Sequence, residues 1–176
     1  MAGEAYVVID MLNDFMDPEG VLYCGDHCLH IIKPVRKALE KAREKDSLIV
    51  YTCDAHTEND LEFRLYPPHA IVGTEGAQII DELEPFSIND IVVFKKSFSA
   101  FYETNFHDVL QKHEIHTLRL MGVCTNICVF CTAIDAVMRG YEVEIHKDEV
   151  ASFDINGHKN ALQQLVDIFQ VKVLEE

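Results

Sequence analysis

Hydrophobic positions along the chain follow two alternating patterns. The first is a short, nearly continuous apolar run, which is typical of a strand buried on both faces of a sheet. Six such runs are Ala5–Ile9, Leu48–Thr52, Ile91–Phe94, His116–Met121, Tyr141–His146 and Val171–Leu174. The second is helical spacing of apolar residues. It predicts helices over Ala77–Leu83, Lys33–Lys45, Phe106–Lys112, Asn126–Arg139 and Asn156–Phe169.

The order of these segments predicts the fold. Strands that alternate with helices form a mainly parallel sheet covered on both faces, so we expect an α/β, three-layer, doubly wound domain with six strands. A chain of 176 residues suits one such domain over residues 1–176. Asp54 to Thr74 is the longest stretch without a predicted element, and a loop of that length is usually functional.

The composition indicates which binding partners and which cellular compartment to expect. Thirty acidic against fifteen basic residues give a net charge of −15, which disfavours binding to nucleic acid or to an anionic membrane. The first apolar run ends at Asp10 and no basic segment precedes it, so we expect neither a signal peptide nor a membrane span, and a cytoplasmic location. The six cysteines are then not expected to form structural disulfides.

Reactive side chains follow several predicted strands. Ligands bind at the carboxyl ends of strands in doubly wound sheets, and Asp10, Lys95 and Cys128 all fall there or in the helix that follows. Cys128 lies in the first turn of a helix that Thr125 or Asn126 can cap, where backbone N–H groups lower a thiol pKa and can bind an oxyanion. Each residue alone has a plainer interpretation, but their convergence favours a thiol nucleophile with a carboxylate base and an ammonium group.

A second group of polar residues lies in the long loop. Asp54 and His56 alternate at a strand end and therefore share one side of the chain, and His69 follows a stiff Pro-Pro pair. With Glu62, they form a set of two imidazoles and two carboxylates that suits Zn²⁺, with Fe²⁺ or Mn²⁺ as alternatives. A loop with these residues could also simply be solvated.

Three segments together resemble the isochorismatase-like cysteine hydrolases. The stretch from Val7 to Phe15 (VVIDMLNDF) resembles their first-strand motif, and Gly122 to Val129 (GVCTNICV) resembles their nucleophile motif. Phe94-Lys95 with Ser97–Phe101 resembles the lysine segment between them. The metal-ligand loop, including Pro67-Pro68 and the following Val72-Gly73-Thr74, resembles that of the metal-containing nicotinamidases, a pyrazinamidase-like group within the family.

The resemblance implies a site and a mechanism. It implies a triad of Asp10, Lys95 and Cys128, and a cis peptide before Cys124 that lets the N–H groups of Cys124 and Cys128 form an oxyanion hole. It implies a metal held by Asp54, His56, Glu62 and His69 that anchors the pyridine nitrogen of the substrate. Phe15, Tyr66 and Phe98 are the candidates for packing its ring. It also implies a homo-oligomer.

The function expected from this resemblance is conversion of nicotinamide to nicotinate and ammonia through a cysteine thioester, in NAD salvage, with pyrazinamide as a further small-molecule amide substrate. One alternative keeps the triad but hydrolyses another amide, ureido or N-carbamoyl compound without a metal. Another is a non-catalytic metal-binding or redox-sensing domain that uses the loop residues or the Cys128–Cys131 pair. Direct NAD binding is disfavoured because no GxGxxG follows the first strand.

Overall fold

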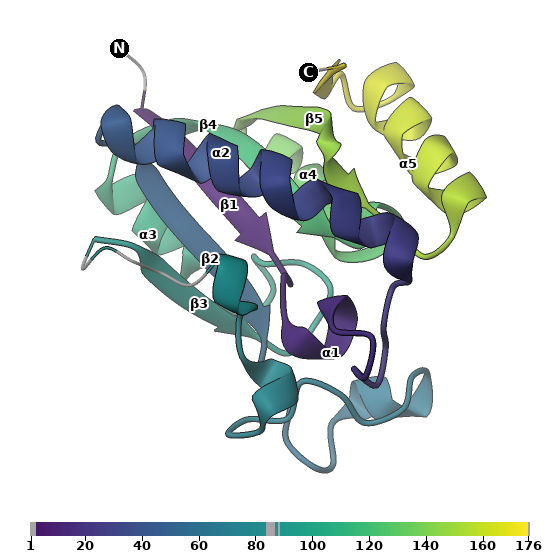
Figure 1. Ribbon diagram of the computed structural model, residues 1–176. Coiled ribbons are helices and arrows are strands. Elements are labelled where there is room, and N and C mark those ends of the chain that lie inside the picture. Colours follow the sequence, from purple (N-terminus) through teal and green to yellow (C-terminus); the bar gives the residue numbers. More distant parts are fainter. Residues whose placement is uncertain (1–2, 84–86, 88, 176) are drawn as a thin grey trace.

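A parallel sheet forms the centre of the computed structural model, which describes residues 3–83, 87 and 89–175 (Figure 1). The strands are β1 (Gly3–Ile9), β2 (Leu48–Asp54), β3 (Ile91–Lys95), β4 (Ile115–Val123), β5 (Glu142–Ala151) and β6 (Lys172–Leu174). Their spatial order is β3-β2-β1-β4-β5-β6, and each neighbouring pair is parallel. The predicted six-stranded, doubly wound α/β class is confirmed, and the sheet of the described residues is parallel throughout.

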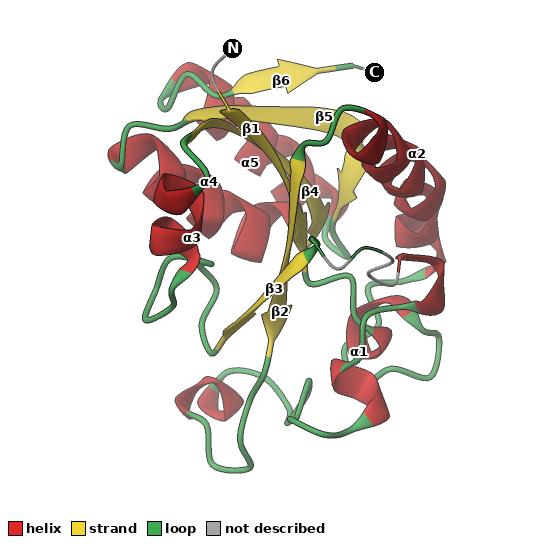
Figure 2. Cartoon of the chain, turned by 90° about the vertical axis from the view of Figure 1, so that its left-hand side faces the viewer, coloured by secondary structure: helices red, strands yellow, loops and turns green. Residues whose placement is uncertain are grey.

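Helices cover both faces of this sheet and produce three layers (Figure 2). The helices are α1 (Asn13–Met16), α2 (Ile32–Glu44), α3 (Phe106–Lys112), α4 (Phe130–Met138) and α5 (Ile155–Asp167). In Figure 2, α2 lies on one side of the sheet and α3, α4 and α5 lie on the other. No helix of the described residues is long and apolar enough to cross a membrane.

The first strand shows why the strand sequences are apolar throughout. Val7 and Ile9 pack into the core that α3, α4 and α5 cover, whereas Tyr6 and Val8 pack into the core beneath α2. Alternate side chains of one strand point to opposite faces, and both faces of this sheet are buried. An uninterrupted apolar run is the consequence.

Two predicted helices differ in the structure. Ala77–Leu83 is not one helix: the chain forms single 3₁₀ turns at Glu75–Ala77 and Asp81–Leu83. Between them the backbone pairs with the segment after β1, where Asn13 N–H donates to Gln78 O at 2.9 Å and Ile80 N–H donates to Met11 O at 3.1 Å. Those bonds hold the backbone extended, so its own helical bonds cannot form.

The predicted helix Asn126–Arg139 begins with a π-helical turn at Thr125–Val129, and α4 follows from Phe130 to Met138. The backbone N–H of Val129 donates to the carbonyl of Cys124, five residues back, at 3.2 Å. Short π-helical turns of this kind are frequent at functional sites. The turn places the candidate nucleophile at the carboxyl edge of the sheet.

The strand order fixes where a ligand can bind. The chain first adds β2 and β3 next to one edge of β1, and it then crosses over to place β4 next to the other edge of β1. The crevice at such a reversal is the usual ligand site of an open parallel sheet. Here it lies at the carboxyl ends of β1 and β4, where Asp10 and the π-helical turn are found.

Candidate active site

The three predicted catalytic residues meet at this crevice. Asp10 directly follows β1, Lys95 is the last residue of β3, and Cys128 lies in the π-helical turn after β4. Lys95 Nζ lies 2.7 Å from Asp10 Oδ2 and 3.7 Å from Cys128 Sγ. A carboxylate oxygen of Asp10 lies within 4.8 Å of Cys128 Sγ. A thiol, a carboxylate and an ammonium group are therefore close enough to exchange a proton and stabilise an anion.

Backbone geometry at the ends of β1 and β4 explains part of this placement. Asp10 has a φ of 51°, its N–H donates to Thr52 O at 3.0 Å, and its Oδ1 accepts from the N–H of Asp54 at 2.9 Å. Gly122 has a φ of 115°, and a Cβ there would lie 2.1 Å from the carbonyl oxygen of Ile9. Only glycine fits such a position, which accounts for the first residue of the nucleophile motif.

The peptide bond between Val123 and Cys124 is cis, as the resemblance implied. The prediction that Thr125 or Asn126 caps the following turn is wrong. The N-cap residue is Cys124, and its side chain makes no capping hydrogen bond. The hydroxyl of Thr125 instead lies 2.9 Å from Nδ1 of His158, and Asn126 Oδ1 accepts from the hydroxyl of Ser152 at 2.5 Å. These bonds tie the turn to the chain around the start of α5.

Lys95 also contacts a second carboxylate. Its Nζ donates to Asp54 Oδ1 at 2.5 Å, and the parallel register of β2 and β3 sets Asp54 directly beside Lys95. All three groups of this cluster, Asp10, Asp54 and Lys95, are buried. The sequence predicted Asp54 only as a metal ligand. The structure makes it the link between the triad and the predicted metal ligands.

Burial and charge set the protonation states of this cluster. Burial, together with the nearby Asp54 carboxylate, raises the pKa of Asp10 to about 6 although Lys95 opposes the shift. Burial alone would lower the pKa of Lys95, but the carboxylates of Asp10 and Asp54 hold it well above its ordinary value. The base is therefore ionised at neutral pH and remains basic enough to accept a proton, which suits a general base.

The thiol of Cys128 differs from the expectation. Burial raises its pKa well above the ordinary value, Lys95 opposes this shift, and the negative charges of Asp10 and Asp54 add to it. The prediction that the turn would lower this pKa is wrong, because the thiol is buried and two carboxylates lie near it. Cys128 therefore rests as a protonated thiol and needs a base to become a nucleophile.

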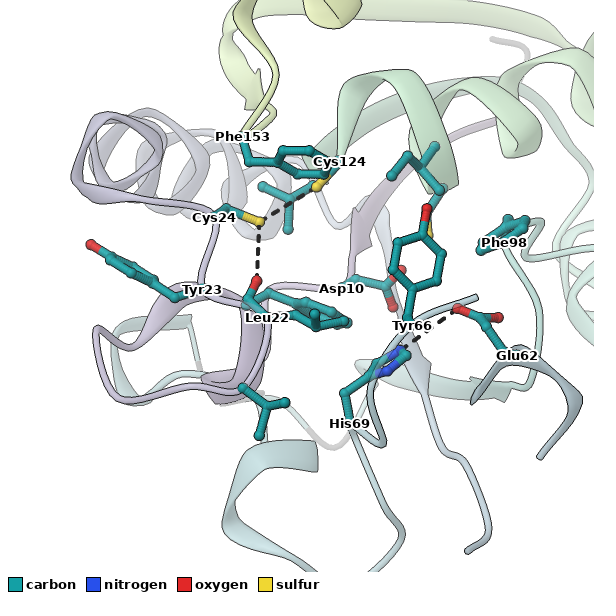
Figure 3. A pocket seen from close by; sticks show the side chains of 15 residues that line it. Asp10, Leu22, Tyr23, Cys24, Glu62, Tyr66, His69, Phe98, Cys124 and Phe153 are labelled. Carbon is teal, nitrogen blue, oxygen red and sulfur yellow. Dashed lines mark hydrogen bonds and ion pairs between the residues drawn. The ribbon is translucent and has the colours of Figure 1, made fainter. Parts of the chain in front are cut away.

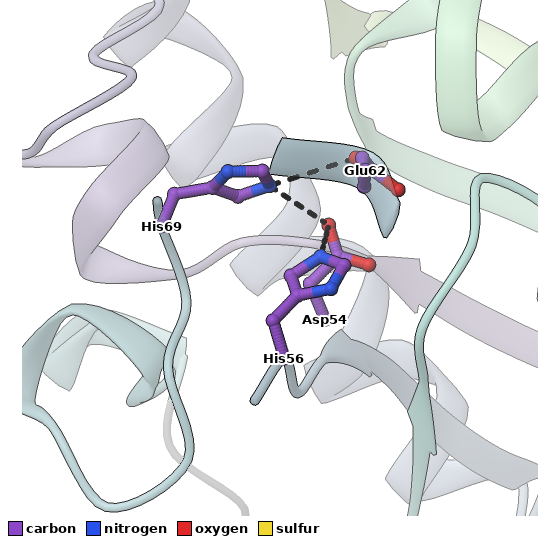
Figure 4. A group of neighbouring side chains, drawn as sticks. All are labelled: Asp54, His56, Glu62 and His69. Atoms are coloured by element: carbon purple, nitrogen blue, oxygen red, sulfur yellow. Dashed lines mark ion pairs between the residues drawn. The ribbon is translucent and has the colours of Figure 1, made fainter. Parts of the chain in front are cut away.

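The four predicted metal ligands converge on one another (Figure 4), and the contact of Asp54 with Lys95 joins them to the triad. One ligand atom from each of Asp54, His56, Glu62 and His69 lies within 4.8 Å of the others. His69 Nε2 is 3.6 Å from Glu62 Oε1 and 4.0 Å from Asp54 Oδ2, and His56 Nε2 is 3.8 Å from the same Asp54 oxygen. The three more buried members are Asp54, His56 and His69.

Two details of the imidazoles fit a divalent cation. His69 Nδ1 donates to the carbonyl of Pro67 at 2.8 Å, which leaves the lone pair of Nε2 facing the two carboxylates. A backbone carbonyl that orients a metal-ligating histidine in this way is a common outer contact of metal sites. His56 is fully buried, and its Nε2 forms no hydrogen bond with any of the residues that the structure describes. A cation bound at Nε2 would satisfy that buried nitrogen.

A further carboxylate near this cluster was not predicted. Asp60 Oδ2 lies 3.3 Å from His56 Nδ1, on the side of the ring away from Asp54. Asp60 also accepts from the N–H groups of Thr57 and Leu61 at 3.2 and 3.1 Å, so its position is fixed by its own loop. One acid among several in this loop gave no sequence signal that would single it out.

A cavity of 320 Å³ opens onto both groups (Figure 3). Its lining includes Asp10 and Cys128, and also His69 and Glu62. The predicted aromatic residues Phe15, Tyr66 and Phe98 all line it as well. A pocket of this size with mostly apolar walls and a few converging polar groups is typical of a small-molecule site.

The opposite end of the cavity was missed by the sequence analysis. Leu22, Cys24 and Phe153 line it there, as Figure 3 shows. These residues come from the segment between α1 and α2 and from the loop before α5. Neither segment carries a motif or a periodic pattern, so only the tertiary structure brings them to the site.

This fold, with a buried thiol, carboxylate and lysine at the switch point of a parallel sheet, defines a class of α/β enzyme site that can perform nucleophilic catalysis. The Isochorismatase domain model matches residues 4–174, and the chain belongs to that family.

Solved structures of related proteins resemble the chain over nearly its full length. The nicotinamidase/pyrazinamidase PncA from Bacillus subtilis is 34% identical with a TM-score of 0.91, covering 98% of this chain and 100% of that one. N-carbamoylsarcosine amidase from Thermoplasma acidophilum is 33% identical with a TM-score of 0.90, covering 99% and 98%. The pyrazinamidase of Pyrococcus horikoshii, in complex with zinc, is 30% identical with a TM-score of 0.90, covering 98% and 99%.

Proposed function

We propose that the protein is a metal-containing amidase that converts nicotinamide to nicotinate and ammonia, and that it also accepts pyrazinamide. The observation that carries this proposal is one cavity lined by both Cys128 with Asp10 and the metal-ligand residues Glu62 and His69. An amide on an aromatic nitrogen ring needs a nucleophile for its carbonyl and an anchor for its ring nitrogen. The similarity to named nicotinamidases supports this proposal. We assign the activity to NAD salvage.

In the proposed reaction, Asp10 takes the proton of the Cys128 thiol as the sulfur attacks the carboxamide carbon. The oxyanion that forms accepts hydrogen bonds from the backbone N–H groups of Cys124 and Cys128. Asp10 then gives the proton to the departing ammonia, which leaves a thioester on Cys128. A water molecule that gives a proton to Asp10 attacks the thioester carbon, the C–S bond breaks to release nicotinate, and Asp10 returns the proton to the Cys128 sulfur. Lys95 stabilises the carboxylate of Asp10 through each transfer.

Asp54, His56, Glu62 and His69 would hold the metal. Their two nitrogen and two oxygen donors suit Zn²⁺, with Fe²⁺ or Mn²⁺ as alternatives. When bound, the cation would attract the lone pair of a pyridine nitrogen and so orient the ring. Phe15, Tyr66 and Phe98 would then pack against the ring, because they line the same cavity. We further propose that residues 1–176 work as one domain, in keeping with the family match over 4–174.

Ammonia release from nicotinamide tests the function directly. The wild-type protein should release ammonia and accumulate nicotinate, and Cys128→Ala should abolish both while its circular dichroism spectrum stays unchanged. Cys131→Ala is a matched control, because Cys131 lies one turn further along and does not line the cavity. A Cys128→Ala protein with near-normal ammonia release would refute the proposal.

A second candidate is hydrolysis of an N-carbamoyl compound, which the similarity to N-carbamoylsarcosine amidase favours. Such a substrate has no aromatic nitrogen for a metal to hold, so this function needs the triad alone. The same assay separates the two candidates when it is run on nicotinamide, pyrazinamide and an N-carbamoyl amino acid, with and without a chelator. Chelator-resistant turnover of the N-carbamoyl compound alone would favour the second candidate.

A further inference from the structure

Two cysteines that the proposed mechanism does not use through their side chains are in contact at the wall of the cavity. Cys24 Sγ and Cys124 Sγ lie 3.4 Å apart, although 100 residues separate them in the chain. Both are buried within the protein and both line the cavity, at the end opposite Glu62 and His69 (Figure 3). A small molecule that enters the cavity therefore meets both sulfurs.

Hydrogen bonds hold both cysteines in position. The N–H of Cys24 donates to Phe15 O at 2.9 Å, and the thiol of the neighbouring Cys28 donates to the carbonyl of Cys24 at 3.3 Å. Cys124 directly precedes the π-helical turn, and its carbonyl accepts from the N–H groups of Ile127 and Val129. The contact is therefore a fixed feature of the wall.

We propose that Cys24 and Cys124 form a redox modification site, in which a hydroperoxide that enters the cavity joins them in a reversible disulfide. A disulfide holds its sulfurs about 2.05 Å apart, so these two must approach by about 1.4 Å from their present 3.4 Å. This pair is distinct from the Cys128–Cys131 pair that the sequence suggested for redox sensing.

The reaction balances with hydrogen peroxide as the two-electron oxidant. The thiolate of Cys124 attacks one peroxide oxygen, the O–O bond breaks, and the other oxygen leaves as hydroxide and takes up the thiol proton as water. Cys24 then attacks the resulting sulfenic sulfur, and its own proton goes to the departing hydroxide. Two thiols and one peroxide give one disulfide and two waters.

Solvent exposure and thiol pKa indicate which cysteine reacts first. Cys124 is 9% exposed and Cys24 is 2% exposed, so Cys124 is more accessible from the cavity. Hydrogen bonds with Cys124 and Cys28, together with burial, raise the pKa of Cys24, which makes it the poorer first nucleophile. Burial also raises the pKa of Cys128, which slows oxidation of the candidate nucleophile itself.

A bond at this position would affect the reaction, and this consequence rests on the proposed function. It would draw Cys124 toward the segment between α1 and α2 and away from the place where its backbone N–H meets the oxyanion. Loss of one oxyanion-hole donor costs about 10²–10³ in kcat. Oxidation should therefore reduce ammonia release by about a hundredfold, and a dithiol reductant should restore it.

The test treats the full-length protein with stoichiometric hydrogen peroxide, then blocks free thiols, digests the protein and identifies cross-linked peptides by mass spectrometry. The expected result is a peptide pair that joins Cys24 to Cys124 and disappears after dithiothreitol. Cys24→Ala should lack the pair and also the reductant-reversible part of the activity loss. Cys131→Ala, as a matched control outside the cavity, should keep both.

Either of two results would overturn the proposal: no Cys24–Cys124 cross-link in the wild-type protein, or reversible inactivation that is equal in Cys24→Ala. The peptide map needs no variant, so the proposal can be refuted even where Cys24→Ala does not fold. It also needs no substrate. A cross-linked protein whose reduced form does not hydrolyse nicotinamide would contradict the proposed function and leave the modification site in place.

Discussion

Replacement of Lys95 by methionine should destabilise the protein strongly, and the loss should depend on pH. Lys95 is 1% exposed, and its ammonium lies 2.7 Å from Asp10 and 2.5 Å from Asp54. Methionine fills a similar volume without the charge. In the metal-free protein, two carboxylates would then remain buried side by side without the ammonium that neutralises them. Removing one partner of a buried ion pair costs about 3–5 kcal/mol of folding free energy.

The pH dependence follows from the carboxylates. In the wild-type protein, burial and the Asp54 charge raise the pKa of Asp10 to about 6. Burial also acts to raise the pKa of Asp54, but Lys95 and His56 together lower it below its ordinary value. Without Lys95 both folded-state pKa values rise above the unfolded values. Near pH 4 the carboxyl groups are protonated in the folded variant and about half protonated in the unfolded chain, so most of the penalty is absent. As the pH rises, the unfolded chain loses protons that the folded variant retains, and the variant loses stability.

Urea unfolding at pH 4 and pH 7.5 measures this difference. With an m-value of about 2 kcal/mol/M, the midpoint of Lys95→Met at pH 7.5 should fall by about 1.5–2.5 M relative to wild type. Lys96→Met is the matched control, because the neighbouring Lys96 is exposed, and it should change stability by less than about 0.5 kcal/mol. A Lys95→Met protein that loses under about 1 kcal/mol at pH 7.5, or loses as much at pH 4, would refute the electrostatic account.

Three further predictions concern the site. Glu62→Gln should weaken metal binding about tenfold or more, measured as metal content after dialysis against a metal buffer, whereas the exposed Glu58→Gln should not. His158→Ala frees the hydroxyl of Thr125 and should lower kcat about three- to tenfold with KM little changed, and His158→Asn should recover part of the loss. Tyr66→Ala removes a cavity wall that also contacts Phe98 and should lower kcat/KM for nicotinamide up to about tenfold, with unchanged unfolding by urea as the check on folding.

Local patterns in the sequence determined the class of fold and the reactive edge of the sheet. Apolar runs such as Ala5–Ile9 are continuous because both faces of a parallel sheet are buried, so the sequence alone predicts the covering helices on both sides. Asp10, Lys95 and Cys128 were identifiable because parallel strands bring their carboxyl ends to one edge. That inference needs only the order of elements and no knowledge of the register.

Register and loop paths were decided only by the tertiary structure. Asp54 faces Lys95 because of how β2 aligns with β3, and this alignment shifts the protonation of the whole cluster. The contact between Cys24 and Cys124 joins segments 100 residues apart, and neither segment carries a pattern that depends on the other. The spacing of apolar residues indicates which face of a strand or helix is buried, because each side chain on that face must itself be apolar. It does not report which distant side chains share a pocket, because that depends on how separate loops pack against each other.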